Sequence, residues 1–231
     1  MKTWFYNRTA YVLLGVPVPQ CFIELDEYFN TRFTTSAAMI HPSVTLAENL
    51  CRRMADIELY AWYISETQKS LDTFRAAIYI GTLLVGYFTA CKSVLDAGAI
   101  TLARVYSLSL SNKEMDFSKR KFWKQLQQAS TTLNDRYVLF HDLFDEVIKW
   151  RDSAIHRATP FVITHSPGAP DKVPRGKMEI KMIAKPDTGM STVVVSPKSV
   201  QWVEPLHFHR KWQSRMIEFC GEICSDIRDR T

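Results

Sequence analysis

Two consecutive stretches with helical periodicity constrain the fold more than any other feature of the chain. From Ser43, a suitable N-cap, apolar residues recur at the spacing of one helix face to about Lys69. Ser70 or Asp72 then caps a second, longer stretch that reaches to about Tyr106. The apolar face of this second stretch comprises Phe74, Ile78, Gly81, Val85, Phe88, Leu95, Ala99 and Leu102. The sequence therefore predicts a long two-helix hairpin and a mainly α fold.

The helical pattern continues after a polar loop at residues 109–116. Three more helices are predicted: a short basic one at 118–129, one that starts at Thr132 or Asn134 and runs towards Pro160, and one from about Glu204 to near Asp229. The predicted helices together indicate an antiparallel helical bundle.

After Pro160 the period changes from 3.6 to 2. Strands are predicted at 161–164, 177–183 and 191–195, separated by turns rich in Gly, Pro and Asp. They predict a small antiparallel β insertion at about 159–203, before the C-terminal helix. Residues 1–42 are predicted to form a mixed N-terminal arm, in which 4–14 carry strand-type residues, and residues 43–231 form the helical domain.

Composition narrows the possible classes of protein. Hydrophobic residues make up 46% of the chain, which excludes a disordered protein. The net charge of +5 permits a polyanionic partner without requiring one. The five scattered cysteines form no zinc-type pair and suit a reducing cytoplasm. The longest apolar window, 76–91, is shorter than the ~20 residues of a membrane span, so we expect a core helix and no membrane partner.

The chemistry that the sequence offers lies where the helix before Pro160 ends. Phe140, Phe144, Val147 and Arg151 form a stripe that is apolar until it reaches the arginine. A guanidinium on a packing face needs a carboxylate, a phosphate or a subunit interface, because burying an unpaired charge is costly. We expect this stripe to be a subunit interface.

Two neighbours of Arg151 complete the motif. Asp152 and His156 are four residues apart, so the carboxylate can orient the imidazole. Arg151 and His156 are separated by roughly 140° around an ideal helix. They can act on one substrate through the reach of the arginine, through a distorted last turn, or through two copies that meet in a dimer.

An arginine and a histidine together can cleave RNA without a metal. The ribose 2′-hydroxyl attacks the adjacent phosphate, the imidazole transfers a proton, and the guanidinium stabilises charge on the phosphoryl oxygens. The structural alternative is a helix C-terminus whose dipole favours His156 and Arg157, with Arg151 in an ion pair.

The long hairpin, the Lys92–Asp96 segment and a late helix that ends in Arg-Asp-x-x-x-His resemble the HEPN superfamily over about residues 43–157. The resemblance implies a helical homodimer, many relatives being metal-independent endoribonucleases, often toxins or defence proteins, with a composite site at the dimer interface. A tyrosine that some toxin members carry two residues after the histidine is replaced by Ala158. Non-catalytic members exist, so a HEPN-like RNA-binding or protein-interaction module is the alternative function.

The resemblance implies a role for each polar residue. Arg151 and His156 would be catalytic, and Asp152 would orient the histidine. Arg157 or the basic residues Lys119, Arg120, Lys121 and Lys124 would bind backbone phosphates of single-stranded RNA. A solvated face of an amphipathic helix explains the run from Lys119 to Lys124 equally well. No cofactor is expected, and an antitoxin or regulatory protein is a possible partner.

Other polar residues admit simpler interpretations. Lys92 and Asp96 could supply a phosphate contact and a partner for Arg151, or form a pair on the helix surface. His207 and His209 diverge on a helix, which argues against a metal site. A third hypothesis is a ligand-sensing bundle whose β insertion recognises a partner.

Overall fold

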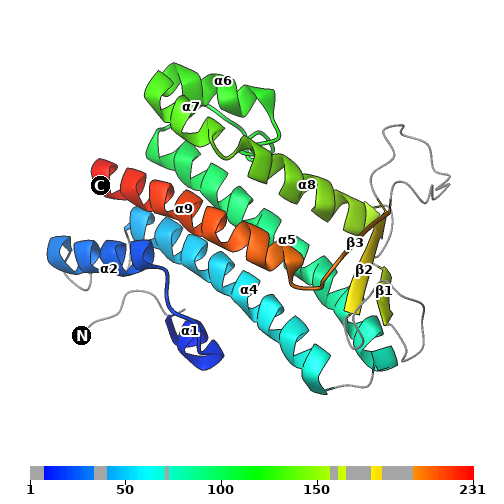
Figure 1. Cartoon of the computed structure of the whole chain (residues 1–231). Helices are drawn as coiled ribbons and strands as arrows, with labels where there is room; N and C mark the ends of the chain where they lie inside the picture. Colours follow the sequence, from blue (N-terminus) through cyan, green and yellow to red (C-terminus); the bar gives the residue numbers. More distant parts are fainter. Residues whose placement is uncertain (1–7, 34–40, 71–72, 157–160, 165–177, 184–199) are drawn as a thin grey trace.

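Long helices build the molecule, as the sequence predicts (Figure 1). The computed structural model describes residues 8–33, 41–70, 73–156, 161–164, 178–183 and 200–231. Helices α4 (Pro42–Ser70) and α5 (Thr73–Val105) form the predicted antiparallel hairpin. Helices α8 (His141–His156) and α9 (His207–Arg230) pack against α5. The mainly α bundle is therefore confirmed.

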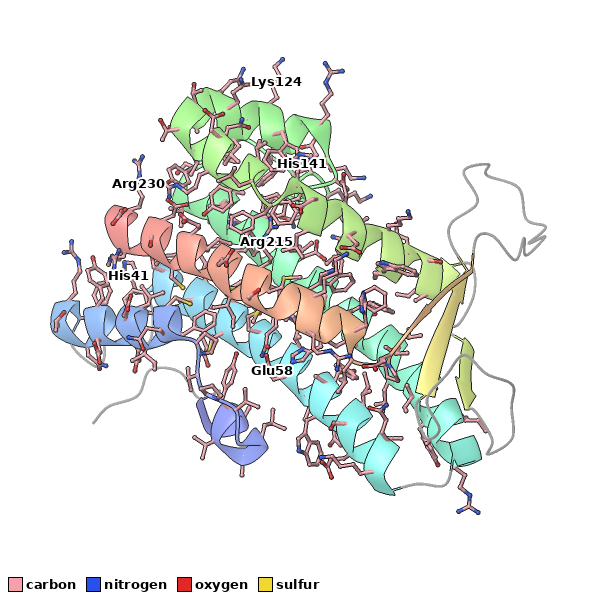
Figure 2. The ribbon with its side chains drawn as sticks, in the orientation of Figure 1. His41, Glu58, Lys124, His141, Arg215 and Arg230 are labelled. Atoms are coloured by element: carbon pink, nitrogen blue, oxygen red, sulfur yellow. The ribbon has the colours of Figure 1, made fainter. Side chains whose placement is uncertain are left out.

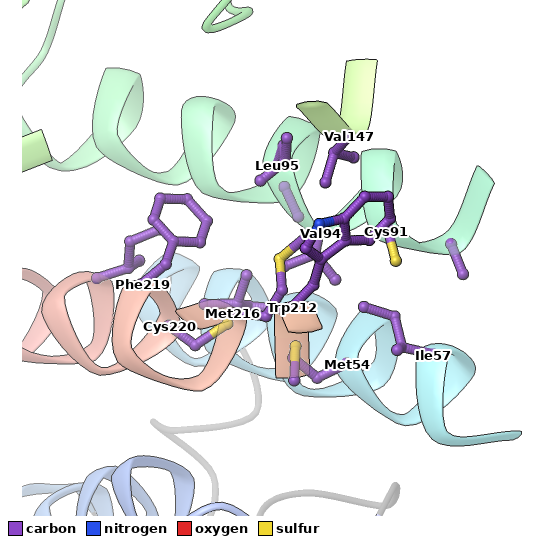
Figure 3. Packing of buried hydrophobic residues seen from close by; sticks show 14 of the residues in the cluster. Met54, Ile57, Cys91, Val94, Leu95, Val147, Trp212, Met216, Phe219 and Cys220 are labelled. Atoms are coloured by element: carbon purple, nitrogen blue, oxygen red, sulfur yellow. The ribbon is translucent and has the colours of Figure 1, made fainter. Parts of the chain in front are cut away.

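Helix α5 lies at the centre of this bundle, because its own side chains are apolar around most of its circumference. The Phe88 ring lies 6.3 Å from that of Trp150 on α8 and 5.2 Å from that of Phe208 on α9. Figure 3 shows the continuation of this core, where Trp212 and Met216 of α9 lie among side chains of α4 and α5. Burial of such large side chains is the main stabilising contribution to a bundle of this kind.

A buried polar network closes the other end of the core. The Asp226 carboxylate on α9 accepts hydrogen bonds from the hydroxyls of Tyr137, at 2.5 Å, and Tyr106, at 2.8 Å. The Arg136 guanidinium donates to the same carboxylate at 2.9 Å. Because Arg136 and Tyr137 belong to α7 (Thr131–Val138) and Tyr106 directly follows α5, the network fixes α7 relative to α9 and to the end of α5.

The prediction of one helix from Thr132 towards Pro160 was wrong, because α7 ends at Val138 and α8 begins at His141. The Phe140 N–H donates to the Tyr137 carbonyl at 3.1 Å. This bond spans three residues, as in a 3₁₀ turn, instead of the four of an α-helix. Tyr137 and Phe140 are both buried, so the chain turns where both side chains enter the core. The preceding basic helix, α6 (Arg120–Ala129), starts close to its predicted position.

The β insertion forms a three-stranded antiparallel sheet in the order β1-β2-β3. Strand β1 (Phe161–Thr164) pairs Val162 with Ile180 of β2 (Met178–Ile183). Both strands agree with the prediction. The strand predicted at 191–195 lies outside the described residues, and the third strand of this sheet is β3 (Val200–Val203).

The described part of the N-terminal arm is helical and packs on the bundle. Helix α1 is Arg8–Leu14, which contradicts the strand character expected there, and α2 is Gln20–Arg32. The Tyr11 side chain is fully buried, and α2 buries Phe22 and Phe29 while packing against α9. Tertiary burial thus outweighs the local strand propensity of the segment.

Candidate functional site

The stripe of α8 that precedes Arg151 is buried within the chain. Phe140, Phe144 and Val147 all belong to the core, and the Phe144 ring lies 5.2 Å from that of Phe219 on α9. The expectation that this stripe forms a subunit interface was therefore wrong. Its apolar part packs against the neighbouring helices of the same chain, and only its end reaches solvent, where the Arg151 side chain is 32% exposed.

The Arg151 guanidinium is only partly satisfied. Its Nη1 donates to Asp152 Oδ1 at 2.8 Å. Its Nε is buried and has no hydrogen-bond partner within the part of the chain that the structure describes. A guanidinium carries five N–H donors, and an unsatisfied buried donor costs about 1–3 kcal/mol. Because the Arg151 side chain is partly exposed, its guanidinium can donate further hydrogen bonds to an anion at the end of α8.

Asp152 contacts Arg151 directly. Helix α8 is α-helical as far as His156, so the five-residue spacing places positions 151 and 156 about 140° apart around the helix axis. The side chain of His156 and the whole of Arg157 lie outside the described residues, so the contacts predicted for them stay predictions.

Lys92 and Asp96 bind each other across one turn of α5, as the simpler interpretation predicted. Asp96 is therefore engaged by Lys92, and the alternative that it is the partner of Arg151 was wrong. Lys92 Nζ also lies 3.2 Å from Asp116 Oδ2, and its side chain is only 12% exposed. Burial raises the pKa of Asp116, but the Ser118 N–H and the Lys92 ammonium outweigh burial and lower the pKa overall. With two carboxylates neutralising it, Lys92 is a poor phosphate ligand.

The predicted RNA-binding lysines and arginine of the α6 region do not gather at the motif. Lys119, Arg120, Lys121 and Lys124 are all exposed. Lys121 Nζ binds Glu114 Oε1 at 2.8 Å, and this hydrogen bond lowers the pKa of Glu114 to about 2. Trp123 of α6 packs on His141, the first residue of α8, with ring centroids 4.7 Å apart. Helix α8 has 16 residues and spans about 24 Å. Helix α6 contacts its first residue, so α6 and His156 lie at opposite ends of α8.

A buried histidine–carboxylate pair was not predicted. His209 Nε2 on α9 lies 3.5 Å from Oε2 of Glu58 on α4, which Figure 2 labels, and Glu58 is only 5% exposed. Gln213 Nε2 donates to the other carboxylate oxygen at 2.9 Å. Burial lowers the pKa of His209, and Glu58 opposes this effect. Two features of the sequence could have indicated this pair. Glu58 is an acid on the apolar face of α4, and His209 and Gln213 are four residues apart on one face of α9.

The described residues contain no group of three or more His, Cys, Asp or Glu side chains suited to hold a metal ion. A groove of about 340 Å³ runs between α4 and α5, lined in part by Arg53, Tyr60 and Gly86. The Tyr60 ring lies across Gly86, where a Cβ would approach within 2.2 Å of it. The groove therefore occupies a different face of α5 from Phe88, which faces α8.

Comparison of the chain with protein-family models, with curated proteins and with solved structures found no match. Among the described helices, residues 78–105 of α5 are long and apolar enough to cross a membrane by length and composition alone. More than half of the most apolar part of this helix is buried inside the bundle, and the core helix of a soluble protein meets the same criterion.

Proposed function

We propose that this chain is a HEPN-like, metal-independent endoribonuclease that acts as a homodimer through Arg151 and His156. The observation that carries the proposal is the state of Arg151. Its side chain is partly exposed at the end of α8, its Nε has no partner among the described residues, and the same helix carries His156 one and a half turns later. The partly exposed guanidinium of Arg151 is thus available to a phosphate on the helix that also carries His156.

The chemistry follows from the residue types. The 2′-hydroxyl of RNA attacks the adjacent phosphorus, and His156 transfers a proton during this attack. Arg151 donates to the phosphoryl oxygens as their charge increases. Asp152 accepts from Nη1 of Arg151, so its proposed role includes holding the guanidinium in addition to orienting His156.

A second copy of the chain explains how the two side chains can act on one phosphate. Because positions 151 and 156 lie about 140° apart around α8, we propose that Arg151 of one copy acts with His156 of the other. Ile155, between them in sequence, is 41% exposed and supplies apolar area for such a contact. The proposed dimer therefore joins the ends of two α8 helices, and the core stripe is not part of it.

The proposal is tested by incubating the purified chain with labelled single-stranded RNA in excess EDTA. Arg151→Ala and His156→Ala should each lower the cleavage rate by about 10²–10⁴-fold. Two matched controls should cleave at the wild-type rate: His141→Ala, an exposed histidine at the other end of α8, and Arg104→Ala, an exposed arginine on α5. Cleavage that survives in His156→Ala would exclude the catalytic assignment.

The alternative is a non-catalytic HEPN-like module that binds RNA or a protein. Two observations favour this alternative. The exposed basic residues of α6 lie at the far end of α8 from the motif, and Lys92 is neutralised by two carboxylates, which makes it a poor phosphate ligand for a catalytic site. RNA binding that depends on Lys124 and Arg120, without any cleavage, would select this module over the enzyme.

A further inference from the structure

Two cysteines far apart in the sequence meet where the N-terminal arm packs on the C-terminal helix. Cys21 lies in the first turn of α2, and Cys224 lies on α9. Both line one small pocket of about 20 Å³, with Arg228 at its edge. The pocket is large enough for about one water molecule.

Helices α2 and α9 are in contact at Gly221 of α9. A Cβ at Gly221, one turn before Cys224, would lie 3.9 Å from the Cβ of Cys21. Cys21 and Cys224 therefore lie side by side along the same small pocket between α2 and α9. A disulfide between them forms when the two sulfurs reach the S–S bond length of about 2.05 Å.

The two thiols have different environments. The hydrogen bond from Cys224 lowers the pKa of Cys21, and the Phe22 N–H at the start of α2 adds to this effect, whereas burial opposes it. Cys21 is partly exposed, while Cys224 is 4% exposed and its pKa is raised, first by the hydrogen bond to Cys21 and then by burial. A partly exposed thiol of lowered pKa beside a buried thiol is the arrangement of a peroxide-sensitive cysteine and its resolving partner.

We propose that Cys21 and Cys224 form a redox site that takes hydrogen peroxide as its oxidant and closes into a disulfide between α2 and α9. The Cys21 thiolate attacks one peroxide oxygen, an S–O bond forms, the O–O bond breaks, and hydroxide leaves and is protonated to water. Cys21 becomes a sulfenic acid, oxidised by two electrons, and the peroxide is reduced.

The second step closes the link. The Cys224 sulfur attacks the Cys21 sulfur, an S–S bond forms, and the S–O bond breaks. The Cys224 proton leaves with the departing hydroxyl group as water, so the two thiols have lost two hydrogen atoms in total. The disulfide ties the N-terminal arm covalently to the C-terminal helix. This site is independent of Arg151 and His156, so its test does not depend on RNA cleavage.

The experiment uses the full chain, reduced, freed of reductant and treated with a small molar excess of hydrogen peroxide. Remaining thiols are blocked with N-ethylmaleimide, and non-reduced peptides are mapped by mass spectrometry. We expect a peptide pair joined through Cys21 and Cys224 that disappears after reduction, and an intact mass lower by two hydrogen atoms. In Cys224→Ser the sulfenic acid of Cys21 should persist and be captured by dimedone.

Cys91→Ala is the matched control, because Cys91 lies in the core on α5 and does not line the pocket. This variant should form the link as completely as the wild type, and Cys21→Ser should lose it entirely. Circular dichroism checks that each variant is folded. The proposal is overturned if folded wild-type protein forms no Cys21–Cys224 link, or if the dominant link joins Cys21 to Cys51 or Cys220.

Discussion

At the scale of single residues, the unexpected features are pairs that come from different helices. Lys92 and Asp96 could be predicted as partners because their four-residue spacing places them on one helix face. Glu58 and His209 could not, because nothing in the sequence specifies which helices meet. The same reason hides the contact between Cys21 and Cys224. Local spacing thus predicts contacts within a helix, whereas contacts between helices depend on the packing of the whole chain.

The Glu58–His209 pair predicts a pH dependence of stability. Burial lowers the pKa of His209 in the folded chain below its value in the unfolded chain. Stability from the neutral imidazole is therefore present above the unfolded pKa of about 6.5, and it is lost as pH falls through that value towards the folded pKa. Urea unfolding of wild type and His209→Gln at pH 7.5 and 5.5 measures this effect.

The wild type should lose more free energy of unfolding between these pH values than His209→Gln does, because only the wild type has the His209 imidazole with its lowered pKa. Carboxylates titrate in both proteins, so their contributions cancel in the comparison. Exposed His141→Gln is the control and should behave like the wild type. Equal losses in wild type and His209→Gln would contradict the inferred shift.

At the scale of elements, periodicity predicted the hairpin of α4 and α5 and the final helix α9 well, since each has a continuous apolar face. The break between α7 and α8 was missed. Residues 138–140 continue the helical pattern, and the turn is set by Tyr137, whose hydroxyl binds Asp226 on a distant helix. The candidate site divides in the same way: the position of Arg151 on α8 was predictable, but its emergence from the monomer core was not.

The packing of α5 against α9 predicts opposite effects for two glycine substitutions. A Cβ at Gly98 would lie 2.5 Å from the Phe219 ring and 2.7 Å from Ile223, both fully buried. Gly98→Ala should therefore lower the free energy of unfolding by about 1–2 kcal/mol, because the overpacking cost exceeds the gain in helix propensity. Chemical denaturation measures the change.

Gly221→Ala on α9 is the matched control, because its Cβ would meet no atom closer than 3.9 Å. It should raise the free energy of unfolding by about 0.5–1 kcal/mol through helix propensity alone. Equal stabilisation by both substitutions would show that α5 and α9 do not approach as closely as described.

At the scale of the whole molecule, the proposed enzyme depends on symmetry. The described core is complete within one chain, so a dimer is not needed to bury the stripe of α8. Within one chain, the five-residue spacing places positions 151 and 156 about 140° apart around α8. The basic residues of α6 lie too far along α8 to reach these positions, although they can hold RNA that extends from the site. The catalytic proposal therefore stands on the pairing of two α8 ends.

Mixing two inactive variants tests this pairing most directly. Arg151→Ala and His156→Ala chains are combined, allowed to exchange subunits, and assayed for RNA cleavage in EDTA. If Arg151 of one copy acts with His156 of the other, cleavage should return to about a quarter of the wild-type rate, because half of the dimers are mixed and each keeps one intact site. A mixture as inactive as its components, in a protein whose wild type cleaves RNA, would contradict the composite site.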